Sequence, residues 1–431
     1  MKVAVLGAGF AGLGAAMRLS ENHEVTIIER LPSLGGVVAS VDYDGAKIPW
    51  GSHWILSTDT SLVDLIKELG LENKLRWKNI RMGFFYEQRI YGIASPLELL
   101  SFSPLPFFAR IRFGLFGLLV LLSKGRLAKS LEGKSAGKWL METAGKDVCD
   151  NLFEPLARIK FNQSLDEISA SWLYNRLVDT AKGGEKYGFL EGGFETLIKA
   201  IKERIEKNGG KIILDSEVRK IGISGGKASS VTFVHGDGEK TIETDAVVSA
   251  LPIPVLLKTA ELPVEYREQL SRVKYKYIIN AFFVLDKKLV SGFDWVNYCY
   301  DGLPFGGTLE HEMSVYKNSD SGSLLYVFTY LNEKDSLWEK SKEEIKNIYQ
   351  TELEKLFPGI VKIIRHAFVE KSNLAWPIYD KDYGSYMPWN KTPVKGLYLA
   401  GIFTTYPKMP STGVAAESGY EASRLIGGEI K

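Results

Sequence analysis

The glycine-rich stretch Gly7-Ala8-Gly9-Phe10-Ala11-Gly12 decides the fold that we expect for this chain. It follows an apolar run, residues 2–6, that is typical of a buried parallel strand, and it precedes a helical pattern over residues 13–19. A strand, a G-x-G-x-x-G loop and a helix in this order form the first half of a dinucleotide-binding βαβ unit. The stretch therefore predicts that a dinucleotide lies across the N-terminus of this helix.

Each glycine has a separate task in such a loop. Gly7 allows the tight turn, Gly9 lets the backbone approach a pyrophosphate, and Gly12 lets helix and strand pack closely. The helix N-terminus adds free N–H groups and a partial positive charge for the phosphates. The expected pyrophosphate contacts are Gly7, Ala8, Gly9, Phe10, Ala11 and Gly12.

The second predicted strand, residues 24–28, ends at an acidic residue, Glu29, which is followed by Arg30 and then by Gly35-Gly36. A carboxylate in this position accepts hydrogen bonds from ribose hydroxyls. Its negative charge would repel a 2′-phosphate. The acid therefore favours FAD or NAD over NADP.

Length and composition set the frame for this unit. A chain of 431 residues is too long for one ordinary core, so we expect two or three domains. The hydrophobic fraction of 45% and the charged fraction of 25% are those of a soluble globular protein. A net charge of +2 gives no argument for nucleic-acid binding.

Cysteine usage and the first residues indicate the compartment. Cys149 and Cys299 have neither metal nor redox spacing, so we expect no metal site and a reduced, cytoplasmic setting. Because the chain opens on the first predicted strand, we expect no signal peptide.

One segment, residues 105–123, is far more apolar than the rest. Arg110 and Arg112 interrupt it, so it is too short to span a membrane, which takes about 20 apolar residues. Residues 110–138 carry seven Lys or Arg against one acid, Glu132. An apolar helix flanked by cations suits a peripheral membrane contact through residues 105–138, on the cytoplasmic face. The alternative is a core helix of a substrate domain whose cations are solvated.

Signals of one nucleotide-binding domain recur in three separated stretches: residues 1–60, 186–255 and 391–431. A mostly helical stretch, 61–185, lies between the first two, and a stretch with strand patterns and one long helix, 256–390, precedes the third. We predict an α/β fold with a Rossmann-type FAD-binding domain built from three segments. We also predict an α+β substrate domain and a helical subdomain. In the first alternative above, the helical subdomain associates with a membrane.

The two later stretches contain further buried strands, over residues 244–252 and 396–401. A last helix follows from Thr412. Its N-terminus offers a second partial positive charge, which would favour negative charge on the pyrimidine ring of a reduced flavin.

With these pieces in place, the chain resembles the flavin amine oxidase superfamily, which includes protoporphyrinogen oxidase, phytoene-type desaturases and amine oxidases. Four stretches carry the resemblance: the loop at 7–12, Glu29-Arg30 with Gly35-Gly36, the strand at 245–252, and the strand at 396–401 with its helix. The apolar helix and its basic flank look most like the protoporphyrinogen oxidase and desaturase branches.

The resemblance implies FAD contacts beyond the glycine loop. Glu29 would hold the adenosine ribose, and the segment 51–53 would pass near the isoalloxazine ring. Gly413 and Val414 would contact the flavin pyrimidine. The remaining cofactor contacts that we carry over are Arg30, Gly35, Gly36, Val37, Gly51, Ser52, Val218, Ala250, Gly401, Ile402 and Thr412.

Three departures from the family pattern bear on chemistry. Pro410-Ser411-Thr412-Gly413 lacks the cysteine of covalent flavoproteins, so FAD should be non-covalent. Ile402 stands where an acid is frequent. An approximate register puts Asn280, with Lys276 nearby, where amine oxidases hold a lysine against the flavin, which weakens an amine-oxidase interpretation.

Catalytic candidates come from the segments that the resemblance puts near the flavin. His53 is the favoured histidine. Aromatic residues before and after the last strand would line a substrate pocket, or else form a packed corner. These candidates are Trp376, Tyr379, Tyr383 and Tyr406. For Glu310-His311-Glu312, a solvated strand end is favoured over an acid/base cluster.

These observations lead to three functional hypotheses. The first is a non-covalent FAD-dependent oxidoreductase that transfers a hydride from a lipophilic substrate to flavin N5, with porphyrinogen, isoprenoid and amine substrates in that order. Oxygen, a quinone or another acceptor would reoxidise the flavin. The second is a mutase that uses reduced flavin without net redox on a nucleotide or lipid-linked sugar, with the cations of 110–138 on the diphosphate. The third is a non-catalytic FAD-binding module.

Overall fold

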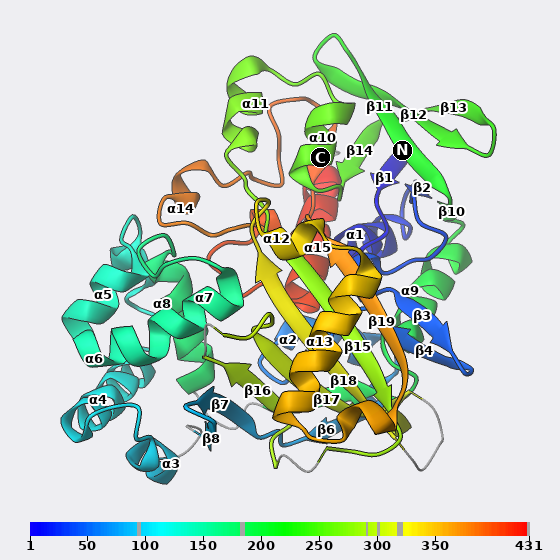
Figure 1. The fold of residues 1–431 in the computed structure, drawn as a ribbon. Coiled ribbons are helices and arrows are strands. Elements are labelled where there is room, and N and C mark those ends of the chain that lie inside the picture. Colours follow the sequence, from blue (N-terminus) through cyan, green and yellow to red (C-terminus); the bar gives the residue numbers. More distant parts are fainter. Residues whose placement is uncertain (93–95, 182–185, 290–291, 300–301, 317–321, 429–431) are drawn as a thin grey trace.

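The computed structural model describes residues 1–92, 96–181, 186–289, 292–299, 302–316 and 322–428. Parts of the predicted ranges 61–185, 256–390 and 391–431 therefore lie outside the described residues. Figure 1 shows two sheets with helices around them, and a group of helices set to one side. The chain is a mixed α/β protein, as predicted.

A five-stranded parallel sheet takes its strands from three distant parts of the chain. Apolar side chains line both faces of its central strands, as the continuous apolar runs predicted. The strand order is β10-β2-β1-β14-β20, so the two latest strands follow the first one in space. The strands are β1 (Lys2–Leu6), β2 (Glu24–Ile28), β10 (Lys211–Ile213), β14 (Ala246–Ser249) and β20 (Leu397–Leu399).

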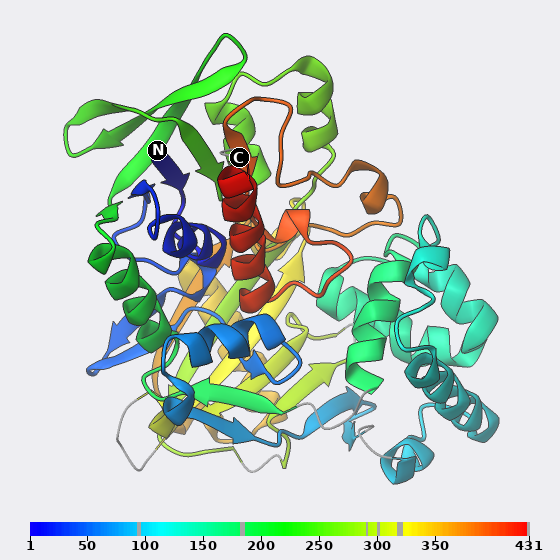
Figure 2. The same cartoon turned by 180° about the vertical axis from the view of Figure 1, so that it is seen from behind.

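Helices α1 (Phe10–Leu19) and α15 (Thr412–Gly428) lie against each other on this sheet, although they come from opposite ends of the chain. Figure 2 shows α15 passing α1 and α2 (Thr60–Glu68). The two backbones approach so closely that a Cβ at Gly419 would lie 2.1 Å from the carbonyl oxygen of Ala11. Helix α9 (Phe194–Lys207) also packs on α1. The contact between α1 and α15 joins the first and third sequence segments into one core.

A three-stranded meander adjoins the parallel sheet at the top of Figure 1. It consists of β11 (Ser216–Ser224), β12 (Lys227–His235) and β13 (Gly238–Glu243). A tight turn at Gly225-Gly226, both with positive φ, joins the first two strands.

A larger sheet has the strand order β19-β15-β18-β17-β16-β7-β8. Its β7 and β8 come from residues 82–92, within the range predicted as helical, and β7 pairs in parallel with β16. The strands are β7 (Met82–Tyr86), β8 (Arg89–Gly92), β15 (Tyr277–Leu285), β16 (Trp295–Tyr298), β17 (Gly307–Glu312), β18 (Ser323–Leu331) and β19 (Ile364–Ser372).

The two faces of this larger sheet have different partners. Helix α13 (Lys342–Leu356), which begins with a capping box at Ser341 and Glu344, buries Ile345 and Tyr349 on one face. The hairpin of β3 (Ser40–Tyr43) and β4 (Ala46–Pro49) packs on part of the other face, where Phe282 lies in one core with Ile48. We call this second face the inner face.

Two smaller groups of elements complete the architecture. The strands β5 (Ile55–Leu56), β9 (Tyr187–Leu190) and β6 (Leu75–Lys78) form a sheet of their own. The remaining helices are α3 (Pro96–Ser101), α4 (Phe107–Ser123), α5 (Ala136–Thr143), α6 (Lys146–Val148), α7 (Glu154–Phe161), α8 (Ala170–Ala181), α10 (Ile253–Thr259), α11 (Val264–Ser271), α12 (Ser336–Glu339) and α14 (Tyr383–Tyr386).

The apolar helix predicted over residues 105–123 is α4, and it lies at the surface. Only Ala109, Phe116 and Val120 are buried along it, so the core-helix alternative is wrong. Helices α3 and α4 stand at the end of the molecule farthest from the meander (Figure 1). Among the described residues no helix is both long enough and apolar enough to cross a bilayer.

Candidate functional site

The glycine loop forms an open cradle at the N-terminus of α1. Gly9 occupies the N-cap position, and no side chain caps the helix. A Cβ at Gly9 would meet no atom within 4 Å, whereas a Cβ at Gly12 would lie 1.9 Å from the carbonyl oxygen of Gly7. Gly36 closes the other side, because its Cβ would lie 3.0 Å from the Cα of Gly9. The loop thus leaves free helix-terminal N–H groups facing open space, which fits a pyrophosphate.

Glu29 ends β2 beside this cradle and is buried. Its carboxylate accepts hydrogen bonds from the backbone N–H of Ala8 at 2.6 Å and of Leu31 at 2.9 Å. Its backbone pairs with Ile213 and Ser216, which brings the start of β11 and the buried Val218 to the same edge. The acid therefore lies where we expect the ribose that is attached to the pyrophosphate. The neighbouring Arg30 is exposed.

The segment after β4 runs from this cradle toward the inner face of the larger sheet. His53 lies against the exposed Val37, with 3.0 Å between its Nε2 and the carbonyl oxygen of that residue. Burial lowers the pKa of His53 to about 4, so its ring is neutral at physiological pH. The neutral ring donates through Nε2, because a carbonyl oxygen only accepts.

Gly51 connects this segment to β15. A Cβ at Gly51 would lie 2.9 Å from Nε2 of His53 and 3.5 Å from Nδ2 of Asn280. Asn280, not Lys276, thus meets the 51–53 segment. Lys276 is buried just before β15, where it donates to the carbonyl oxygen of Asn162 and to Oδ1 of Asn332, both at 3.3 Å.

The N-terminus of α15 has internal partners that the sequence did not reveal. The N–H of Gly413 donates to Oδ2 of Asp59 at 3.1 Å, and the N–H of Val414 donates to Oγ of Ser411 at 3.0 Å. Burial raises the pKa of the Asp59 carboxyl. The two amides expected on the flavin pyrimidine are therefore engaged within the protein, and Asp59 is a candidate site residue that sequence reasoning missed.

The strand and loop before α15 are held by α15 itself. The N–H of Gly401 donates to Oγ of Ser418 at 2.8 Å. The carbonyl oxygen of Ile402 accepts from the hydroxyl groups of Tyr379 and Thr405. Ile402 therefore stabilises this loop through its backbone carbonyl group. Ser52, Ala250 and Thr412 are partly buried around the same region, while Gly35 is buried beside the glycine loop.

The predicted aromatic residues divide into two groups. Tyr379, Tyr383 and Tyr406 are buried and pack together, with ring centroids 4.7 to 5.5 Å apart. The hydroxyl of Tyr383 donates to the carbonyl oxygen of Phe403, and that of Tyr406 donates to Glu132. This group is a packed corner. Trp376 lies apart, stacked between Phe161 and Tyr330.

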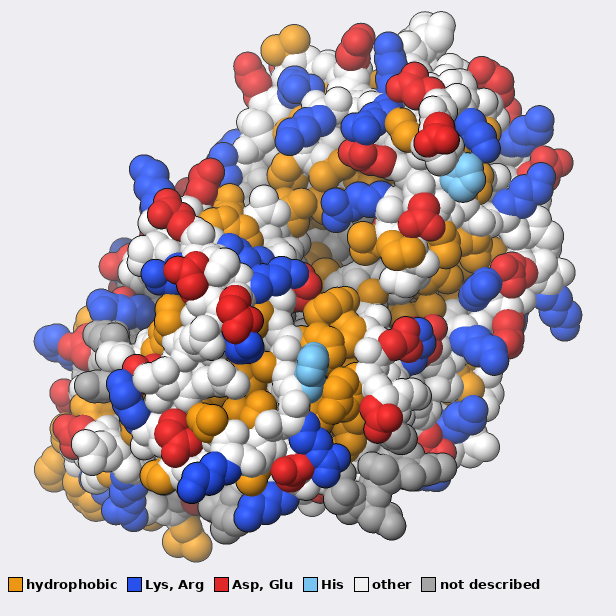
Figure 3. All heavy atoms as spheres, turned by 45° about the vertical axis from the view of Figure 1, so that its right-hand side comes forward, with side chains coloured by type: hydrophobic (Ala, Val, Ile, Leu, Met, Phe, Trp, Pro, Cys, Tyr) orange, Lys and Arg blue, Asp and Glu red, His pale blue; other side chains and the backbone are white. Residues whose placement is uncertain are grey.

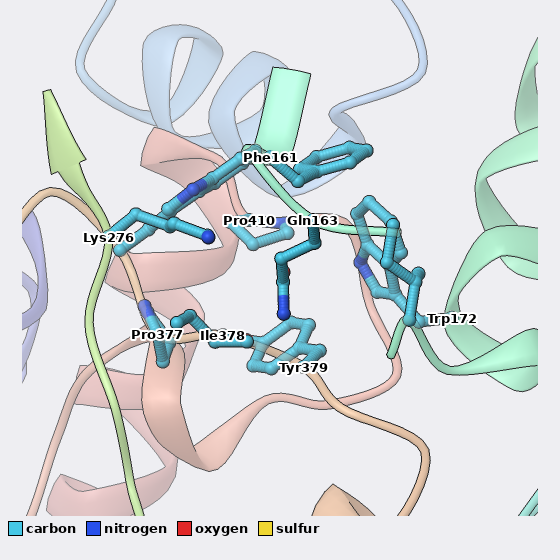
Figure 4. A pocket seen from close by; sticks show the side chains of 10 residues that line it. Phe161, Gln163, Trp172, Lys276, Pro377, Ile378, Tyr379 and Pro410 are labelled. Carbon is cyan, nitrogen blue, oxygen red and sulfur yellow. The ribbon is translucent and has the colours of Figure 1, made fainter. Parts of the chain in front are cut away.

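A small cavity lies between these two groups. Its volume of about 20 Å³ suffices for one water molecule. Figure 4 shows the ends of Lys276 and Gln163 pointing into it. Burial lowers the pKa of Lys276 to about 8. The cavity is lined by Phe161, Gln163, Ile168, Trp172, Lys276, Trp376, Pro377, Ile378, Tyr379 and Pro410.

The segment Glu310-His311-Glu312 differs from the solvated strand end that the sequence analysis favoured. His311 is buried against Trp54 and Tyr316, and burial lowers its pKa to about 3. Glu310 is buried too and accepts from Oγ of Ser323 at 2.6 Å. A solvated strand end is therefore wrong for both residues. Strand β17 continues through both residues. The alternation of side chains along a strand therefore puts His311 on the inner face and Glu310 on the other face.

The comparisons with known proteins can be set beside this geometry. The family model described as flavin containing amine oxidoreductase matches residues 10–427. This chain belongs to that family. As a flavin-containing amine oxidoreductase family member it is a flavin-dependent oxidoreductase, and the uncapped α1 N-terminus, the open space at Gly9 and the buried Glu29 fit a flavin nucleotide.

Relatives of this flavin oxidoreductase match along its full length. A 15-cis-phytoene desaturase from Synechococcus elongatus is 28% identical and covers 99% of this chain and 96% of its own. A zeta-carotene desaturase from Synechocystis is 24% identical, with coverages of 99% and 97%. The structure of an oxidoreductase from Methanosarcina mazei has a TM-score of 0.77 at 22% identity, with coverages of 98% and 100%, which shows the fold.

Proposed function

We propose that the chain binds FAD non-covalently and dehydrogenates a lipophilic substrate of the isoprenoid hydrocarbon type. The observation that carries this proposal is the aromatic inner face of the larger sheet, which meets the 51–53 segment at Asn280. Phe328 lies directly opposite Asn280 in the ladder, and Tyr330 lies next on the same face. An apolar, aromatic surface holds a hydrocarbon and excludes water, while the flavin supplies the hydride acceptor.

The cofactor would extend from the glycine loop to the start of α15. The free N–H groups of residues 9–12 would hold the pyrophosphate, and Glu29 would accept from the adenosine ribose. Val218 would lie beside the adenine. The isoalloxazine ring would then lie near 51–53, with its pyrimidine toward Thr412. The two cysteines of the chain, Cys149 and Cys299, are both free and neither stands in the stretch 410–413 before that helix, which supports non-covalent binding.

The desaturase relatives support an isoprenoid substrate over the other two classes. Both are named for carotenoid precursors, and both match over nearly all of this chain. An amine substrate is disfavoured because the approximate register from the sequence puts Asn280 where amine oxidases carry a lysine. Oxidation of a porphyrinogen is one of the outcomes that the test below distinguishes. The electron acceptor would be oxygen, a quinone or another oxidant.

A peripheral membrane contact fits the same function, since such a substrate dissolves in a bilayer. The outward side of α4 exposes 82% of Phe108, 51% of Leu118 and 65% of Leu122. Leu97 and Leu100 of α3 extend this apolar surface. The exposed cations that follow α4 would face anionic headgroups. They are Lys124, Arg126, Lys129, Lys134 and Lys138.

Two of the seven cations in the basic flank give the mutase hypothesis no support. The guanidinium group of Arg110 donates to the carbonyl oxygens of Leu100 and Leu105, and that of Arg112 donates to those of Glu142 and Thr143. Both groups thus hold backbone in place and are not presented to a diphosphate. Membership of an enzyme family likewise disfavours a non-catalytic module.

The test is anaerobic reduction of the purified flavoprotein. Its absorbance and the cofactor released by acid identify FAD and its non-covalent attachment. The protein is then mixed with vesicles that carry 15-cis-phytoene, zeta-carotene, protoporphyrinogen or a polyamine. Bleaching of the flavin by phytoene or zeta-carotene supports the proposal. Bleaching by protoporphyrinogen or polyamine alone overturns the substrate class, and protein that binds no FAD overturns the whole proposal.

A further inference from the structure

Lys160 places an ammonium group on the aromatic inner face of the larger sheet. It belongs to α7, which crosses β16 and β18. Its Nζ lies 3.8 Å from the ring centroid of Trp295 and 5.0 Å from that of Phe328. Phe161, the next residue, stacks on Trp376 beside the small cavity. Lys160 therefore belongs to the same wall as the expected substrate surface.

This lysine has no hydrogen-bond acceptor or carboxylate partner among the described residues. Lys276, the other lysine on this side of the sheet, donates to Asn162 and Asn332. Keeping an unpaired charge among aromatic rings costs folding free energy, and a Met or Leu would fill the space without that cost. The ring faces of Trp295 and Phe328 compensate only in part.

The sheet connects Lys160 to the segment near the flavin. Phe328 is flanked by Asn280 of β15 on one side and Gly307 of β17 on the other. A Cβ at Gly307 would lie 2.3 Å from Cζ of Phe328, so the ring leans over Gly307, toward β16. Neighbouring strands lie about 4.8 Å apart. Asn280, which meets Gly51, and the ammonium over Phe328 thus border one continuous strip of the inner face.

The surroundings of Lys160 favour its neutral form. Its pKa is lowered to about 7, mainly by burial and also by the cationic Arg176 of α8, while Cys299 beyond β16 acts in the opposite direction. Tyr330 of β18 stays a neutral phenol, because burial raises its pKa to about 12. At physiological pH a large fraction of Lys160 is therefore a free amine with a lone pair.

We propose that Nζ of Lys160 accepts the proton released when the substrate is dehydrogenated. A carbon–carbon bond becomes a double bond when one carbon gives a hydride to the oxidised flavin and its neighbour gives up a proton. The electron pair of that second C–H bond forms the new π bond, and the proton goes to the amine. The resulting ammonium later returns the proton to water. This inference rests on the proposed function.

The first test needs no substrate. In protein labelled with [ε-¹³C]lysine, the Lys160 resonance is assigned by its loss in Lys160→Met, and that of Lys276 by its loss in Lys276→Met. We expect the Lys160 signal to titrate near pH 7. A signal that titrates with the exposed lysines, near pH 10, would overturn the inference, because a permanently charged lysine accepts no proton.

The second test compares anaerobic flavin reduction by phytoene-loaded vesicles in three variants. Lys160→Met should slow reduction on the order of 100-fold with FAD content unchanged. Lys160→Arg should be as slow, because arginine keeps the cation on Trp295 but stays protonated. The exposed Lys146→Met, which lies outside this wall, should match the wild type, whose rate should rise as the pH passes about 7.

The outcomes separate the two proposals. If the wild type reduces its flavin and Lys160→Arg does so equally fast, the lysine only supports the fold and the inference fails while the proposed function stands. If the wild type is not reduced by any hydrocarbon, the proposed function fails and the inference fails with it.

Discussion

The carboxylate of Asp59 caps α15 by accepting from the N–H of Gly413, a residue 354 positions later in the chain. A Cβ at Gly413 would lie 2.1 Å from Oδ1 of Asp59, so a glycine is needed for the contact. The same carboxylate accepts from the N–H of Leu62 and thereby caps α2. One buried acid therefore joins α2 to α15 at the place where we propose the flavin pyrimidine.

This acid predicts a measurable effect on the cofactor. Asp59→Asn removes negative charge from the N-terminus of α15, which should stabilise a reduced, anionic flavin. We expect the midpoint potential of the bound flavin to rise by about 30 mV, equivalent to ~1.4 kcal/mol for a two-electron couple. Dye-equilibrated titration measures it. An unchanged potential would mean that the pyrimidine ring lies elsewhere.

Two glycines of the first loop should respond differently to one methyl group. Gly9→Ala adds its Cβ to open space, so the unfolding free energy of the apoprotein should change by less than about 0.5 kcal/mol while FAD content falls. Gly12→Ala drives its Cβ into the carbonyl of Gly7 and should destabilise the fold by roughly 1–3 kcal/mol. Urea unfolding and cofactor content measure both. Normal FAD content in Gly9→Ala would contradict the pyrophosphate assignment.

The apolar side of α4 predicts reversible binding to anionic vesicles. Replacing Leu118 and Leu122 by Asp should weaken flotation with such vesicles on the order of 100-fold, because two apolar contacts are lost and two like charges are added. Stability and FAD content should be unchanged, since both side chains are largely exposed. Val264→Asp, on the 72% exposed Val264 of α11, is the matched control. Wild-type protein that never floats refutes the contact.

Two histidines with lowered pKa values predict acid sensitivity. The pKa values of His53 and His311 are lowered to about 4 and about 3, below the ordinary value of 6.5. The unfolded state therefore binds more protons below pH 6.5, and the unfolding free energy should fall as the pH drops from 6.5 toward 4. Urea unfolding at pH 7.5 and pH 5 measures this. His53→Gln and His311→Gln should each lose part of the difference; if neither does, the sensitivity has another source.

The parallel sheet was predictable because each part of it has a local signal. The loop at 7–12 has its glycine spacing, and the strands at 246–249 and 397–399 are short apolar runs between turn residues. Parallel pairing of such runs needs little more than burial on both faces. The strands of the sheet come from the three stretches, 1–60, 186–255 and 391–431, in which the sequence shows nucleotide-binding signals.

The remaining features depend on contacts between distant residues. The exposure of α4 could not be read from the sequence, because a helix that is apolar on all sides has no face to orient it. Nothing near Lys160 in the sequence indicates Trp295, and nothing near residue 82 indicates pairing with β16. The burial of His311 follows from Trp54 and Tyr316 packing over the sheet, which strand alternation alone does not reveal.

The molecule also has a hollowed face, seen near the centre of Figure 3 with apolar side chains on both sides.

The order β2-β1-β14-β20 has a consequence for how the protein is made. During translation, the glycine loop leaves the ribosome long before β14, and β20 and α15 follow only after residue 397. Until then β14 keeps an open edge and α1 lacks the helix that buries it, both of which are exposed to misassociation. Cofactor capture is therefore a late event in biosynthesis, and nascent chains released before residue 397 should depend on chaperones and remain colourless.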